Sequence, residues 1–184
     1  MDKMIDSENL SYRISWRPNS RSVNIMNNAL DLNGTDLGPS VLEAEWTVVI
    51  DIPVAGVSTV IDALEKNIPL IQGPYDCCIY LREGGHQRFR ALQGSHAGAE
   101  GTIQQTPASQ IVFSIPTDEV LLKRVFEIVF QSHVNEEPTI RVYPAWGSRS
   151  KLLDDKDNPN RYWNRADSDQ IHGQPTGTQP KGNQ

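Results

Sequence analysis

Three residues of this sequence are candidate metal ligands: His133, Glu136 and Cys77. His133 and Glu136 are three residues apart, nearly one helical turn, so both side chains can face one side at a helix end. Imidazole nitrogen combined with carboxylate oxygen or thiolate sulfur suits zinc or copper at an open coordination position. We therefore predict a weak divalent metal site, completed by Cys77 or by His96 of the same or a neighbouring subunit.

Each of these ligands also has a structural interpretation. A histidine at a helix C-terminus interacts favourably with the last carbonyl groups, and His133 follows an amphipathic segment. A cysteine on a strand is most often a small buried apolar side chain, which applies to Cys77 and to its neighbour Cys78.

A second group of residues has the chemistry of an anion site. Arg88, Arg90 and His96 supply donors, while Gly98 and Gly101 belong to a glycine-rich passage whose backbone amides can be exposed. This passage lacks the Gly-Lys-Ser/Thr ending of a phosphate-binding Walker loop. We predict a small anionic ligand here, with an ordinary solvated loop as the alternative.

Covalent catalysis finds little support in the sequence. Ser95 stands beside His96 without the Gly-x-Ser-x-Gly turn that presents a nucleophile. A metal-assisted enzyme needs three or more converging ligands, and the 133–137 segment supplies only two. We therefore predict a non-enzymatic binding or regulatory module that holds a divalent metal or a small anion. A small metal-assisted hydrolase is the alternative, and a purely structural interaction module also remains open.

Hydrophobic periodicity predicts the elements that must position these residues. The expected order is a strand at 47–52, a helix at 57–64, a strand at 75–81 that turns at Gly84-Gly85 into a second strand at 87–92, a strand at 109–115, a helix at 118–129 capped by Thr117, and a strand at 139–143. This order predicts an α+β fold, the ferredoxin-like split βαβ sandwich, with an extra β-hairpin.

Apolar content divides the chain into three segments. We predict a partly ordered N-terminal extension at 1–45, a ferredoxin-like domain at 46–146 and a C-terminal extension at 147–184 with a largely disordered tail. Tyr162 and Trp163 are the apolar exception in the last segment, and we expect them to dock on the core.

Charge and composition exclude several classes of function. The formal net charge of -6 gives no electrostatic footprint for nucleic acid or an anionic membrane. No apolar run approaches the ~20 residues needed to cross a bilayer. The N-terminus lacks the pattern of a secretory signal, and the two cysteines are adjacent, so we expect no disulfide framework. The cytoplasm is the expected compartment.

Several short motifs occur in an order that is typical of one family. They are Gly73-Pro74-Tyr75-Asp76-Cys77-Cys78, Phe89-Arg90-Ala91-Leu92 followed by Gly94, Gly101-Thr102-Ile103, and His133-Val134-Asn135-Glu136-Glu137-Pro138 followed by Tyr143-Pro144. Together they resemble the YqfO-type domain, a CutA-like module related to the PII signalling proteins. This module is found alone or inserted in larger dimetal proteins of the Nif-three type. The sequence departs from the family pattern at Ala91, Val134 and Asn135, where the family has proline, proline and tyrosine.

The resemblance implies a CutA-like fold and a homo-oligomer, most simply a trimer, with ligands in the clefts between subunits. The larger relatives hold their two metals with residues of flanking domains, so no dimetal site is carried over to residues 46–146. We also expect Ile140, Val142 and Trp146 to leave an apolar edge on the last strand that oligomerisation covers.

Overall fold

The computed structural model of the chain describes residues 30–96, 98, 100–151, 166–167 and 170. Three predictions concern residues outside this described part: the partial ordering of residues 1–29, the disordered tail, and the docking of Tyr162 and Trp163. The domain limits of 46 and 146 stay a prediction, although strand residues continue on both sides of them.

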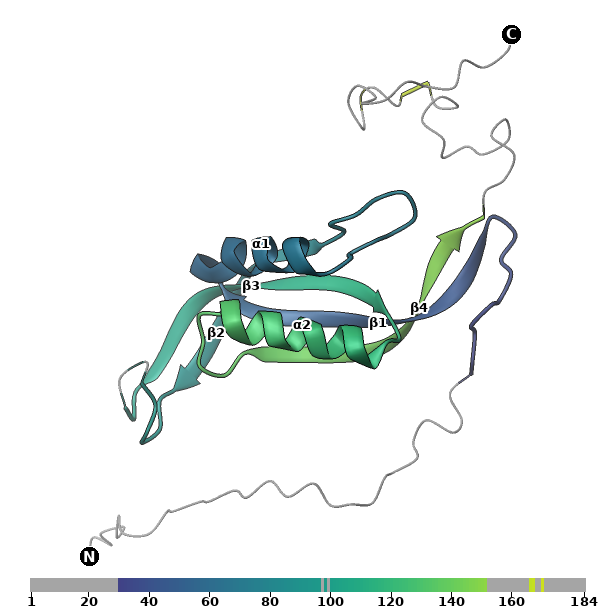
Figure 1. Cartoon of the computed structure of the whole chain (residues 1–184). Coiled ribbons are helices and arrows are strands. Elements are labelled where there is room, and N and C mark those ends of the chain that lie inside the picture. Colours follow the sequence, from purple (N-terminus) through teal and green to yellow (C-terminus); the bar gives the residue numbers. More distant parts are fainter. Residues whose placement is uncertain (1–29, 97, 99, 152–165, 168–169, 171–184) are drawn as a thin grey trace, which may run out of the picture. The chain divides into compact units, whose positions relative to one another are not determined.

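A four-stranded antiparallel sheet with two helices on one face forms the structure (Figure 1). The strands are β1 (Ser40–Pro53), β2 (Tyr80–Arg90), β3 (Ile103–Pro116) and β4 (Thr139–Ser150), in the spatial order β2-β3-β1-β4. The helices are α1 (Val57–Asn67) and α2 (Glu119–Ser132), and a short 3-10 turn, η2 (Val54–Gly56), precedes α1. The order β-α-β-β-α-β confirms the α+β, ferredoxin-like expectation.

The core lies between the helices and one face of the sheet. Alternate residues of β1, namely Val48, Ile50 and Ile52, have no exposed surface because their side chains all point toward the helices. They form one cluster with residues of β3 and of both helices: Ile111, Phe113, Ile115, Val60, Leu64, Val125, Ile128 and Val129. Each helix therefore buries one apolar face, with Val60 and Leu64 of α1 and Val125, Ile128 and Val129 of α2 in the core.

Both helices follow from local sequence signals. Asp118, and not Thr117 as expected, caps α2: its carboxylate accepts hydrogen bonds from the backbone N–H groups of Val120 (2.8 Å) and Leu121 (3.2 Å). A carboxylate accepts both bonds at once and also suits the positive end of the helix dipole, which explains the shift by one residue. Within the described residues, neither helix is long and apolar enough to span a bilayer.

The predicted hairpin at Gly84-Gly85 is wrong. The chain runs straight through these residues as one strand, β2, and the β2–β3 register shifts between Arg82 and Gly85. Gly84 has φ +85°, and a Cβ on Gly85 would lie 3.2 Å from the carbonyl oxygen of Ala108. The two glycines therefore make a β-bulge against β3 instead of a turn. Gly73-Pro74 is a turn, as expected, between Gln72 and Tyr75.

Two pairs of strands extend beyond the central sheet as arms. Beyond the pair Pro53–Ala108, β2 and β3 continue alone, and we call residues 85–107 the β2–β3 arm. At the other end, the first residues of β1 extend beyond β3 and pair with the last residues of β4, from Ser40–Ser150 onward. Both arms extend past the ends of the two helices, as Figure 1 shows. Pro144 lies opposite Trp46 in β4, where a proline is tolerated because β4 is an edge strand.

An ion pair sits over a glycine where β1 and β4 begin to separate from β3. Glu45 is 8% exposed, and its carboxylate accepts hydrogen bonds from Arg149 Nη2 (2.6 Å) and Ser114 Oγ (2.8 Å). A Cβ on Gly147 would come within 2.2 Å of Glu45 Oε2. Gly147 is therefore required for the carboxylate to lie flat on the sheet between its two donors.

We expect Gly147→Ala to lower the free energy of unfolding by about 1–3 kcal/mol, because the added methyl group overpacks against a carboxylate that cannot move without losing its donors. Urea denaturation checks this. Glu45→Ala removes the clash, so adding Gly147→Ala to Glu45→Ala should cost much less than Gly147→Ala alone. Equal costs in the two backgrounds would contradict the close approach.

Candidate functional site

A cleft of about 510 Å³ opens between the β2–β3 arm and the loop that joins α2 to β4. The arm contributes His86, Gln87, Arg88, Phe89 and Ser95, and the loop with its neighbours contributes Val134, Asn135, Glu136, Glu137, Thr139 and Asp51. The sheet brings these segments together: β4 begins with Thr139 opposite Asp51 of β1, and the arm starts where β1 ends. Two regions that the sequence singled out, 88–101 and 133–136, thus meet at one end of the fold.

His133 is held on both sides of its ring. It ends α2, where its backbone N–H donates to Val129 O (2.8 Å). Nδ1 accepts the backbone N–H of Asn135 at 2.9 Å, so Nε2 carries the proton and donates to Asp51 O at 3.1 Å. With both ring nitrogens engaged, His133 connects α2 to β1, which fits the structural interpretation of this histidine.

Glu136 meets His96 across the mouth of the cleft. The carboxylate accepts the backbone N–H of His96 (3.1 Å), and Nδ1 of the same residue lies 3.2 Å from Glu136 Oε1. The His96 side chain is 89% exposed and that of Glu136 is 49% exposed. Of the predicted metal ligands and their alternatives, this pair is the one that the fold places in direct contact.

The remaining anion-site residues lie on the β2–β3 arm. Strand alternation places Arg88 and Arg90 on one face of the arm and Gln87 and Phe89 on the other. Gln87 Oε1 accepts from Asn135 Nδ2 at 3.4 Å, so the arm also contacts the loop on that side. Arg88 and Arg90 line a shallow pocket of about 380 Å³ with Ile103, and neither makes an ion pair with another described residue.

Gly98 and Gly101 shape the end of the arm. Both have positive φ, of 88° and 75°, and a Cβ on Gly98 would approach Gln104 Nε2 within 2.6 Å. The absence of a side chain at Gly98 therefore lets its backbone lie close to the side chains of Gln104 and Phe89.

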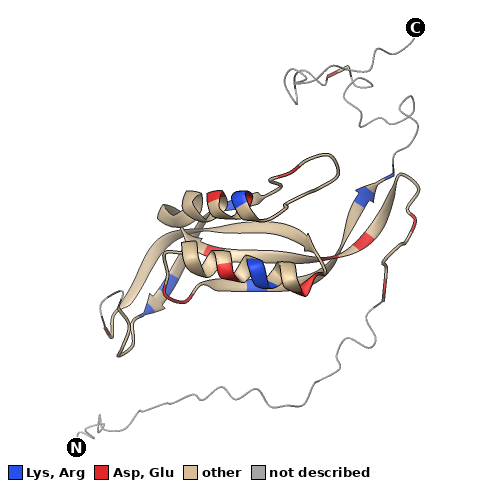
Figure 2. Cartoon of the chain, in the orientation of Figure 1, with Lys and Arg blue, Asp and Glu red and all other residues tan. Residues whose placement is uncertain are grey.

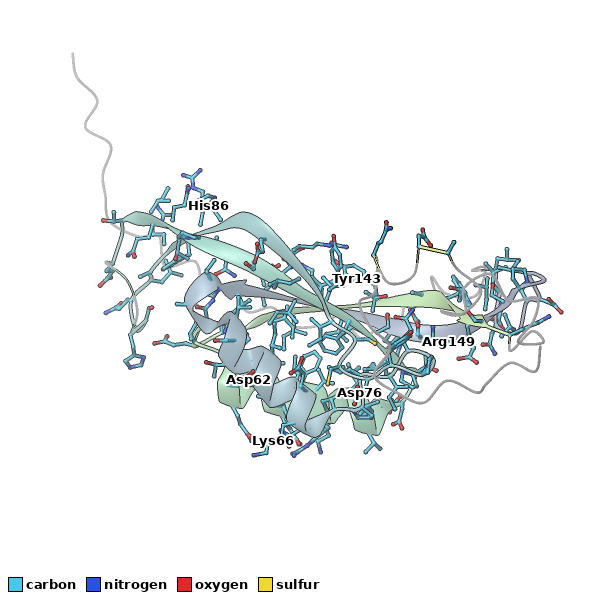
Figure 3. The ribbon with its side chains drawn as sticks, turned by 90° about the horizontal axis from the view of Figure 1, so that it is seen from above. Asp62, Lys66, Asp76, His86, Tyr143 and Arg149 are labelled. Atoms are coloured by element: carbon cyan, nitrogen blue, oxygen red, sulfur yellow. The ribbon has the colours of Figure 1, made fainter. Side chains whose placement is uncertain are left out.

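Cys77 is remote from this cleft. It belongs to the segment between α1 and β2, where it is exposed and has φ 52°. Its neighbour Asp76 and His86 of the cleft lie toward different ends of the molecule (Figure 3). Among the described residues, no three His, Cys, Asp or Glu side chains gather closely enough to hold a metal ion. Within one chain, then, the predicted set His133, Glu136 and Cys77 is not brought together.

The face of the sheet opposite the helices forms a second polar surface, which we call the open face. Its centre is a shallow pocket of about 520 Å³ lined by Thr47, Val49, Asp51, Arg82, Gln110, Arg141 and Tyr143. Asp51 accepts hydrogen bonds from Gln110 Nε2 (2.7 Å) and Arg141 Nη1 (2.5 Å), and this hydrogen bond raises the pKa of Arg141. Every charged side chain named here except Arg82 is thus neutralised by a neighbour, and the Arg82 guanidinium lies over the ring of Tyr80.

No pattern in the sequence predicted this face. Thr47 and Asp51 alternate with the core residues of β1, but the nearly continuous apolar run around them reads as a strand buried on both faces. The expectation for the last strand also needs correction. Ile140 and Val142 pack against the core beneath the helices, and only Trp146 of the three is exposed, at 37%. Strand alternation points the first two inward, so they leave no apolar edge.

Comparison with known proteins gives structural matches only. No protein-family model matches the sequence, and no curated protein does. The structure is similar to a NIF3-related protein from Bacillus cereus, at 25% identity and a TM-score of 0.49 over 61% of this chain and 28% of that one. It is also similar to CutA1 from Oryza sativa (15% identity, TM-score 0.42, covering 56% and 82% of the two chains). A divalent cation tolerance protein from Thermus thermophilus matches at 20% identity and a TM-score of 0.40, over 55% and 84%.

NIF3-related and CutA1 proteins are also the two groups that the sequence motifs resemble. The chain spans little more than a quarter of the length of the NIF3-related protein and most of the length of the CutA1 proteins.

The chemistry of Cys77 leads to a prediction. Desolvation, followed by the negative charges of Asp76 and Glu65, raises the pKa of its thiol above the ordinary value. Because the thiolate is the nucleophile, a raised pKa leaves less of it at any given pH. We expect Cys77 in a Cys78→Ser variant to react with iodoacetamide at pH 7.4 more slowly than free glutathione does, although it is exposed. The rate should rise steeply above pH 9. A rate equal to that of glutathione at pH 7.4 would contradict the assignment.

Proposed function

We propose that this protein is a binding module that takes a divalent cation at the His96–Glu136 pair. The observation that carries the proposal is the contact itself: two ligand-type side chains, 40 positions apart in sequence, lie 3.2 Å apart at the open mouth of a cleft. A neutral imidazole has a lone pair to offer, and a carboxylate beside it compensates the charge of the ion.

Water would supply the remaining ligands, because no third His, Cys, Asp or Glu side chain among the described residues gathers with this pair. Metal ions in proteins can keep water at open coordination positions, and a site with two protein ligands is expected to be weak. His133 is left out of the proposed ligand set, because coordination would require it to give up its bond to Asn135 or to Asp51.

We expect metal-free protein to bind zinc or copper saturably, and His96→Ala to abolish binding below about a millimolar. Protons compete with the metal ion for the imidazole lone pair, so affinity should fall as the pH is lowered. Isothermal titration calorimetry on protein purified without chelator measures both effects. His172→Ala, a histidine outside the described residues, is the matched control and should bind like the wild type.

Two outcomes of this titration contradict the proposal: no saturable binding by the wild type, or equal loss of binding in His96→Ala and His172→Ala. Retained binding in a folded His133→Ala protein supports the exclusion of His133 as a ligand. These outcomes separate the proposed ligand pair from the alternative pair that sequence spacing alone favours.

A second candidate ligand is a small anion on the face of the β2–β3 arm that carries Arg88 and Arg90. Arg88 and Arg90 favour it, because they share one face with no ion pair from a described residue and border a pocket with Ile103. Two guanidinium groups on one face can bind phosphate or carboxylate oxygens together. Titration with pyrophosphate in the absence of metal distinguishes this candidate, since it depends on the two arginines and not on His96.

A metal-assisted hydrolase has less support. It requires three or more converging ligands, and the described residues hold no such group. The cytoplasmic location and the disordered tail stay predictions.

We further propose that the protein self-associates through the open face of its sheet. No helix among the described residues covers this face, and Tyr143 on it is 49% exposed. Its charged groups, apart from Arg82, are already paired: Asp51 with Arg141 and Gln110, Glu45 with Arg149 and Ser114. Packing this face against second copies therefore leaves few charged groups buried without a partner. Unpaired buried charge is the usual obstacle to burying a polar surface.

Placing an unpaired charge on the open face should prevent assembly. Tyr143 is 49% exposed there, and we expect Tyr143→Arg to convert an oligomer, most simply a trimer, into a monomer at tens of micromolar. Light scattering coupled to size exclusion reads the mass. Phe130→Arg is the matched control, because Phe130 is 52% exposed on α2 in the helix layer, away from the open face. A wild-type monomer, or equal dissociation by both variants, would contradict this interface.

A further inference from the structure

The last residues of β3 have a partner strand on one side only. β1 pairs with β3 as far as Glu45–Pro116, whereas the pairing of β2 with β3 stops at Tyr80–Val112. Residues 113–116 of β3 therefore form a short open edge on the side away from β1. An open edge offers backbone donors and acceptors that another extended segment can use.

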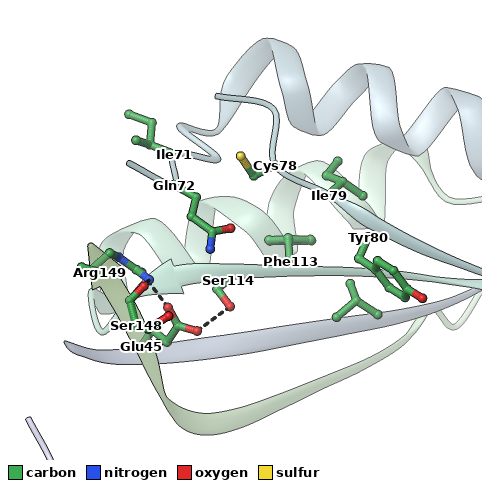
Figure 4. Close-up of a pocket in the computed structure, with 12 residues that line it drawn as sticks. Glu45, Ile71, Gln72, Cys78, Ile79, Tyr80, Phe113, Ser114, Ser148 and Arg149 are labelled. Carbon is green, nitrogen blue, oxygen red and sulfur yellow. Dashed lines mark hydrogen bonds and ion pairs between the residues drawn. The ribbon is translucent and has the colours of Figure 1, made fainter. Parts of the chain in front are cut away.

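A cleft of about 480 Å³ lies along this edge. Figure 4 shows its walls: Ile71, Gln72, Cys78 and Ile79 from the segment between α1 and β2 on one side, Tyr80 at the start of β2, and the end of β4 with the Glu45–Arg149 pair on the other. Ile71 is 60% exposed and Tyr80 is 65% exposed. The cleft thus combines exposed apolar walls with a carboxylate and a side-chain amide.

The chain leaves the sheet beside this cleft. Gly147, Ser148 and Arg149 line it, β4 ends at Ser150, and the backbone N–H of Lys151 donates to Pro39 O at 3.0 Å. The segment that follows therefore starts from Lys151, two residues beyond Arg149, which lines the cleft. The two aromatic residues of this following segment, Tyr162 and Trp163, are its largest apolar side chains.

We propose that the C-terminal segment occupies this cleft, with Tyr162 and Trp163 against Ile71 and Tyr80. Eleven residue steps separate Lys151 from Tyr162, which can span at most about 40 Å, enough to return to a cleft at the starting point. A buried indole N–H needs an acceptor, and the Glu45 carboxylate and the Gln72 amide in the cleft supply one. The occupant is the protein's own segment, held near the cleft by its covalent connection, which raises its effective concentration there.

Trypsin tests the proposal, because Arg161 and Arg165 flank the aromatic pair and Lys181 lies further along the same segment. In the full-length protein we expect cleavage after Arg161 and Arg165 to be at least about tenfold slower than cleavage after Lys181, since a docked segment must first detach. Ile71→Glu should raise the first two rates to that of Lys181. Ile103→Glu is the matched control: Ile103 is 59% exposed on the β2–β3 arm, and its substitution should leave the rates unchanged.

A second variant covers the case that Ile71→Glu disturbs the fold. In the double variant Tyr162→Ser, Trp163→Ser, with the native circular dichroism spectrum, amide hydrogen exchange of residues 70–80 should become faster than in the wild type. Equal cleavage at all three sites in the wild type, equal acceleration by Ile71→Glu and Ile103→Glu, or protection that is lost on dilution would overturn the proposal. The last result would indicate that a second copy, and not the same chain, fills the cleft.

Discussion

The whole structure depends on the central position of β1. This strand is one of the two inner strands of the described sheet, and it pairs with β3 over 45–53 and with β4 over 40–51. Its inward side chains Val48, Ile50 and Ile52 anchor both helices, and its outward side chains form the middle of the open face. Because side chains alternate strictly along a strand, one register error in β1 would exchange the core and the open face.

The same strand organises the candidate site. Asp51 is the point at which three parts of the molecule meet: its carbonyl holds His133, its carboxylate holds Arg141, and its backbone lies opposite the first residue of β4. The loop that carries Glu136 is therefore fixed at both ends, by the end of α2 and by the start of β4. The β2–β3 arm, which begins at the β-bulge, leads to His96, and His96 contacts Glu136 of this loop.

Much of this could be predicted from the sequence where one physical signal dominates. The stripes of α1 and α2 and the cores of β1 and β3 follow from apolar periodicity, which burial enforces directly. Gly84-Gly85 was misleading because two glycines serve a tight turn and a β-bulge equally well, and only the pairing with β3 decides between them. The bonds that occupy the ring of His133 could not be predicted for a similar reason, since they come from Asp51, 82 positions away, and from the local loop backbone. The His96–Glu136 contact depends on the length and twist of the arm, for which no local pattern exists.

Pro144 gives the exposed strand β4 a property that matters before the protein is fully folded. A proline in the ladder must turn its nitrogen away from the neighbouring strand, so the outer edge of β4 lacks one hydrogen-bond donor opposite Trp46. A foreign strand arriving at this edge finds its hydrogen-bond ladder interrupted near the middle of twelve residues. Neighbouring nascent chains on a polysome are therefore less prone to aggregate through pairing of their β4 edges. Contacts between the faces of their sheets are unaffected.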